Sequence, residues 1–104
     1  MDKEIKMLFE LAYYPVMYAN QRLNGGDFLS VAIPLMDALR QQINDENKLK
    51  RAARQLVLEF NNLLTPKMSV SQIDDTINMI YNPSDLTRAM AKYIADENVK
   101  KLGH

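Results

Sequence analysis

Residues 5–19, with the sequence IKMLFELAYYPVMYA, decide what kind of fold this chain can adopt. Only Lys6 and Glu10 are charged in this stretch. A surface helix normally has one apolar stripe and one polar face. Here, at ~100° per residue, apolar side chains extend almost all the way round the helix. This helix must therefore be covered on most sides, either by its own domain or by another chain.

Two apolar stripes run along this first helix. The first stripe consists of Ile5, Leu8, Ala12 and Val16. The second, about 160° away, consists of Met7, Leu11, Tyr14 and Tyr18. Tyrosine is enriched at interface centres, and methionine adapts to irregular surfaces. The second stripe therefore either completes the domain's own core, with its hydroxyls in solvent, or faces a partner.

A partner-binding surface is accordingly predicted beside Pro15, which should kink or split the helix. The residues of this surface are Met7, Leu11, Tyr14, Met17 and Tyr18. We expect Tyr14→Glu or Tyr18→Glu to weaken assembly without unfolding the domain.

The whole chain, residues 1–104, reads as one all-α domain, a compact bundle of about five helices. No segment shows the sustained alternation of a β-strand. The helices are expected near residues 2–23, 28–44, 46–64, 70–81 and 83–102.

Local signals set these boundaries. Asn24-Gly25-Gly26 should end the first helix, and either Asp27 or Ser30 should cap the second. The polar run 44–47 indicates a break, although one continuous bent helix is the alternative. Ser69 and Gln72 form a capping-box pattern. Asn82-Pro83 predicts the start of the last helix.

The four later helices each carry one apolar stripe that is expected to face the core. These stripes are Ala32, Leu35, Met36, Leu39 and Ile43; Leu49, Ala53, Leu56, Phe60 and Leu63; Val70, Ile73, Ile77 and Ile80; and Leu86, Met90, Tyr93 and Ile94.

Composition excludes several classes of function. Thirteen basic and thirteen acidic residues give no net charge, so nothing draws the whole molecule toward phosphate or a membrane surface. The absence of cysteine excludes disulfides and thiolate metal sites. The apolar stretch 5–19 is shorter than the about 20 residues that span a bilayer, and its mixed-charge flank is unlike a signal peptide. We expect a cytoplasmic protein.

No catalytic constellation is visible. The single histidine, His104, is the last residue, so Ser-His and Cys-His catalysis are excluded. No phosphate-binding glycine loop occurs. Adjacent carboxylates such as Asp74 and Asp75 diverge by about 100° on a helix and cannot share a metal. We therefore predict a protein that is not an enzyme, with no cofactor, no metal and no evident small-molecule substrate.

The strongest electrostatic feature lies at the start of the third helix. Its residues are Lys48, Lys50, Arg51 and Arg54, on the side opposite the apolar stripe. These cations could be a solvated face paired with Asp45, Glu46 and Glu59, or they could contact an acidic protein or a nucleic acid. Zero net charge argues against strong phosphate affinity.

The leading hypothesis is a small helical protein that acts by binding another protein or a second copy of itself. It would be a regulator, adaptor or inhibitor, of the kind common among bacterial and phage accessory factors. The alternative is a nucleic-acid-binding regulator that uses the basic face of the third helix.

Overall fold

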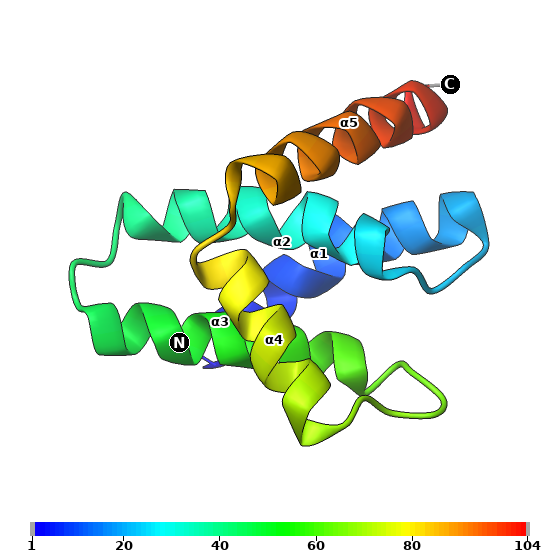
Figure 1. The fold of residues 1–104 in the computed structure, drawn as a ribbon. Coiled ribbons are helices and arrows are strands. Elements are labelled where there is room, and N and C mark those ends of the chain that lie inside the picture. Colours follow the sequence, from blue (N-terminus) through cyan, green and yellow to red (C-terminus); the bar gives the residue numbers. More distant parts are fainter. Residues whose placement is uncertain (1, 104) are drawn as a thin grey trace.

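The computed structural model describes residues 2–103. In this part of the chain, five helices are joined by short loops, and no strand is present (Figure 1). The all-α prediction is confirmed. The helices are α1 (Asp2–Asn20), α2 (Gly25–Arg40), α3 (Glu46–Asn61), α4 (Val70–Tyr81) and α5 (Asp85–Leu102).

The central helix is α2. In the view of Figure 1, α5 lies above α2 and α3 lies below it, while α1 passes behind and α4 crosses in front. An aromatic cluster fills the space where α1, α2 and α3 meet. Phe28 stacks on Phe60 with 4.5 Å between ring centroids, and Tyr13 meets Phe60 edge-on at 5.5 Å. Such pairs add about 1 kcal/mol each beyond the burial of their area.

The buried side of α1 is rotated about the helix axis relative to the predicted stripe. The buried residues are Ile5, Phe9, Tyr13 and Val16. Leu8, which was expected in the core, is partly exposed. Phe9 and Tyr13 carry the largest rings, so the helix faces the α2–α3 seam with these residues instead of Leu8. α1 continues through Pro15 as one helix and is not split there.

The connection between α1 and α2 differs from the prediction. α1 ends at Asn20, and Gln21 adopts a positive φ of 54°, so a glutamine takes the left-handed position expected of a glycine. Asn24 caps α2, because its side chain accepts from the N–H groups of Gly26 and Asp27. Gly25 and Gly26 therefore begin the second helix instead of ending the first.

Neither of the predicted caps of the second helix is correct. Asp27 and Ser30 both lie inside α2, where Ser30 Oγ donates to the Asp27 carbonyl at 2.7 Å. Pro34 also lies within the helix, which ends at Arg40, four residues earlier than expected. The predicted break before α3 is confirmed, with Asp45 as its N-cap.

The boundaries of α4 agree with the prediction, and the capping box of Ser69 and Gln72 is formed. The start of α5 does not agree, because Ser84 is the N-cap in place of Asn82. The Ser84 hydroxyl accepts from the N–H of Thr87 at 3.1 Å. This short local bond leaves Pro83 just outside the helix.

Of the predicted apolar stripe of α5, only Ile94 is partly buried, and the other three residues do not face the core. The structure buries Ala91 and Asn98 instead, while Leu86, Met90 and Tyr93 are exposed. Small residues on this side of α5 allow it to lie close to α2. On α4, the predicted stripe holds except at its start, where Val70 is 77% exposed.

Candidate functional site

An apolar row lies on the side of α1 that faces away from the core, beside the charged residues Lys3, Lys6 and Glu10. We call it the α1 face, and it consists of the five predicted residues Met7, Leu11, Tyr14, Met17 and Tyr18. Met7, Leu11 and Tyr18 are 60%, 68% and 68% exposed. Tyr14 and Met17 are half-buried and pack against the core. The fold therefore covers part of this face and leaves its outermost row in solvent.

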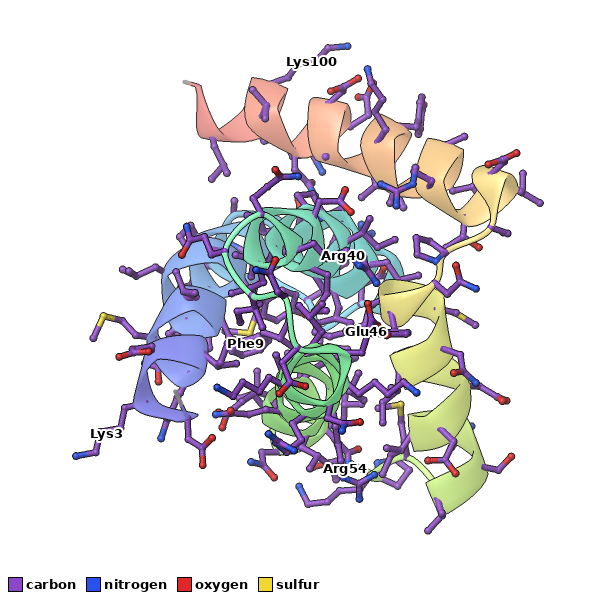
Figure 2. All side chains as sticks on the ribbon, turned by 90° about the vertical axis from the view of Figure 1, so that its left-hand side faces the viewer. Lys3, Phe9, Arg40, Glu46, Arg54 and Lys100 are labelled. Atoms are coloured by element: carbon purple, nitrogen blue, oxygen red, sulfur yellow. The ribbon has the colours of Figure 1, made fainter. Side chains whose placement is uncertain are left out.

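A chain of aromatic rings connects the α1 face to the core. Tyr14 meets Phe9 edge-on at 6.1 Å and meets Tyr18 edge-on at 6.1 Å. Figure 2 shows Phe9 pointing inward, whereas Lys3, on the first turn of the same helix, points away from the body of the protein. Tyr14 is therefore held from both sides, and Tyr18 extends this row outward.

A groove adjoins the α1 face at its N-terminal end. It lies between α1 and the C-terminal end of α2, and its volume is about 390 Å³. Met7 and Leu8 line it from α1, and Leu39 and Ile43 line it from the end of α2 and the following loop. Because Met7 belongs to both features, the groove and the α1 face form one apolar surface.

The predicted basic residues all lie on the exposed side of α3. These are Lys48, Lys50, Arg51 and Arg54. Arg54 points away from the bundle in Figure 2. Lys48 and Arg51 come together at a small surface pocket, which Asp2 and Gln55 also line. The structure therefore keeps the four cations on one face of the helix.

The acidic residues expected to pair with these cations have other partners or form no bridge to them. Asp45 caps α3, and Glu46 accepts a hydrogen bond from the Tyr81 hydroxyl. Lys50 Nζ lies 5.7 Å from the centre of the Tyr81 ring. Within residues 2–103, none of the four cations forms a salt bridge.

A buried polar cluster at the start of α2 was not predicted from the sequence. Asp27 is fully buried at the start of α2. Its carboxylate accepts from Arg22 Nε at 3.0 Å, from Asn20 Nδ2 at 3.1 Å and from Asn98 Nδ2 at 3.1 Å. Burial pushes the pKa of Asp27 upward, but the hydrogen bonds from Arg22, Asn98 and Asn20 outweigh burial and lower it. The cluster joins three helices and is structural.

No local signal could have identified this cluster. Asp27 follows Gly-Gly and resembles a helix cap, and Asn98 lies in a charged stretch where a polar residue is expected at the surface. Asn98 is 71 positions from Asp27, so only the tertiary packing of α5 on α2 brings the two side chains together.

Neither a cluster of metal-ligating side chains nor a membrane-spanning helix is found in the described part of the chain. No three carboxylate or imidazole side chains within residues 2–103 could hold a metal ion together. None of the helices in that range is long and apolar enough to cross a bilayer. His104, noted from the sequence, lies outside the described residues.

Comparison with known proteins adds no functional information. No protein-family model, no curated protein and no solved structure matches this chain. The α1 face with its groove is one of the exposed apolar surfaces of the described residues.

Proposed function

We propose that this protein acts by binding another protein through the α1 face, as a regulator, adaptor or inhibitor without catalytic activity of its own. The observation that carries the proposal is the exposed row of Met7, Leu11 and Tyr18. Large apolar side chains scattered singly on a surface are ordinary, whereas a contiguous row marks an interaction site.

The shape of this surface suits a helix of the partner. Met7 and Tyr18 are eleven residues apart, so the exposed row is about 16 Å long, or three helical turns. An amphipathic helix presents anchors at the same spacing, and the groove beside Met7 and Leu8 can receive one of them. Tyrosine provides a large contact area at low entropic cost, which suits the centre of such an interface.

The proposal is tested by capture from cells that express the protein, with quantitative mass spectrometry. Wild type is compared with Leu11→Glu and Tyr18→Glu, and with Val70→Glu as the control, because Val70 is an equally exposed apolar residue on α4. We expect one set of proteins to be retained by wild type and Val70→Glu and lost from the two α1 variants. Equal capture by all four proteins would contradict the proposal.

A second candidate function, nucleic-acid binding, is favoured by one observation. The four basic residues of α3 are all exposed and form no salt bridge within residues 2–103. Binding to duplex DNA at low salt, weakening steeply as salt rises and lost in Arg51→Glu, supports this function. Absence of binding at low salt, or binding that is indifferent to salt, rejects it.

A further inference from the structure

α5 presents a second apolar row to solvent. We call it the α5 surface, and it consists of Leu86, Ala89, Met90 and Tyr93. Leu86, Met90 and Tyr93 are 72%, 56% and 68% exposed. With Ile94, the last three residues of the row border an open apolar depression. In both figures α5 lies at the outer edge of the bundle, and no other helix lies beyond it.

The charges beside this row favour one occupant. Asp85 precedes Leu86, and Lys92 precedes Tyr93, so the two charges occupy equivalent positions seven residues apart on one margin of the row. If a second α5 lies antiparallel, with Leu86 against the second copy's Tyr93, then Asp85 faces the second copy's Lys92. The two-fold axis repeats this pair. In a parallel pair, this margin of one helix would face the opposite margin of the second copy, so Asp85 and Lys92 would not meet.

We propose that α5 binds a second copy of this chain, antiparallel, through the α5 surface. Ala89 lies near the middle of the row, where its small side chain allows the two helices to approach closely. Lys92 lies 3.8 Å from Asp96 of its own helix, so in the pair it sits between two carboxylates. The inference concerns a different surface from the α1 face and does not rest on the function proposed above.

The contact is small for a protein–protein interface. α5 contains 18 residues and is about 27 Å long. One helix face contributes less than the about 800 Å² per partner of a standard interface. We therefore expect a reversible dimer with a dissociation constant on the order of 10 µM, which separates into single chains on dilution.

The first experiment is sedimentation equilibrium over a range of chain concentrations. We expect the wild-type mass to rise from one chain to two, and the mass of Tyr93→Glu to remain at one chain at every concentration. Val70→Glu and Tyr18→Glu serve as controls and should dimerise like wild type. A wild type that stays single at millimolar concentration overturns the proposal, and so does a dimer that Tyr18→Glu disrupts and Tyr93→Glu does not.

The second experiment tests the antiparallel register by exchanging charges. In Asp85→Lys alone, both contacts oppose two lysines, and in Lys92→Glu alone, both oppose two acids. Each variant should therefore dimerise at least threefold more weakly than wild type. An equimolar mixture of the two variants restores opposite charges at both contacts and should recover the wild-type affinity as a heterodimer. A mixture that associates no better than either variant overturns the proposed register.

Discussion

Asn98 Nδ2 of α5 donates a hydrogen bond to Asp27 Oδ1 of α2 at 3.1 Å, across 71 positions of the chain. Asn98 Oδ1 in turn accepts from Asn20 Nδ2 at the end of α1, at 2.9 Å. Few apolar side chains of α5 are buried, and Ala91 is small. The buried carboxylate of Asp27 therefore helps to hold α5 against α2, where few apolar side chains of α5 are buried.

The first prediction concerns the removal of that carboxylate. Asp27→Ala leaves the Asn98 amide without its acceptor and removes the partner of Arg22, and the free energy of unfolding should fall by about 3 kcal/mol. Urea denaturation followed by circular dichroism measures the change. Asp37→Ala is the control, because Asp37 pairs with Arg88 in solvent at 2.7 Å and should cost about 1 kcal/mol or less. Equal losses of unfolding free energy in the two variants would show that the buried cluster stabilises the fold no more than the exposed Asp37–Arg88 pair does.

The second prediction concerns acid. The folded state lowers the pKa of Asp27, so the unfolded chain binds its proton first, near the ordinary value of about 3.9. The stabilisation by this carboxylate is thus fully present above that value and is lost as the pH falls through the lower folded pKa. The difference in unfolding free energy between wild type and Asp27→Asn should be constant from pH 7 to 5 and shrink below about pH 4. A difference that is unchanged at pH 3 would contradict this account of the carboxylate.

The third prediction separates two neighbouring tyrosines. Tyr14 packs edge-on against the buried ring of Phe9, whereas Tyr18 is largely exposed. Tyr14→Ala should lower the free energy of unfolding by about 1–2 kcal/mol, and Tyr18→Ala should change it by less than about 0.5 kcal/mol. Thermal denaturation checks both values. Tyr18 is then the better of the two for testing binding, because its replacement leaves stability unchanged. Equal losses in the two variants would contradict this distinction.

The fourth prediction compares two adjacent glycines at the start of α2. A Cβ at Gly25 would meet nothing within 4 Å, whereas a Cβ at Gly26 would lie 2.9 Å from Ile94 Cδ1 and 3.0 Å from the capping oxygen of Asn24. Gly25→Ala should therefore raise the free energy of unfolding by about 0.5 kcal/mol through the entropy of the unfolded chain. Gly26→Ala should be less stable than Gly25→Ala, because the side chains of Ile94 and Asn24 must shift. The reverse order in a thermal melt would contradict the close approach of α5 to α2.

The features predicted correctly from the sequence are those with local signals. The capping box of Ser69 and Gln72 depends on two residues that are three positions apart, and the break before α3 depends on the polar run 44–47. α3 also carries a single apolar stripe. These signals act before any tertiary contact forms, so they could be interpreted in isolation.

The errors occur where tertiary packing chooses between alternatives. α1 has apolar residues on most sides, and the size of Phe9 and Tyr13 decided which side faces the core. On α5, periodicity identified the row of Leu86, Met90 and Tyr93 but could not show which side of the helix is covered. Asn98, on the buried side, is satisfied only by Asp27 from another helix. The residues of the α1 face could thus be named from the sequence, whereas their exposure could not.

The most direct test of the central claim, that the α1 face binds another protein, is photo-crosslinking in cells that express this protein. A photoreactive phenylalanine derivative replaces Leu11 or Tyr18 in turn, and Val70 in the control. We predict adducts with a different protein at positions 11 and 18 and none at position 70. Adducts at all three positions, no adduct at 11 and 18, or adducts there with a second copy of this chain would contradict the claim.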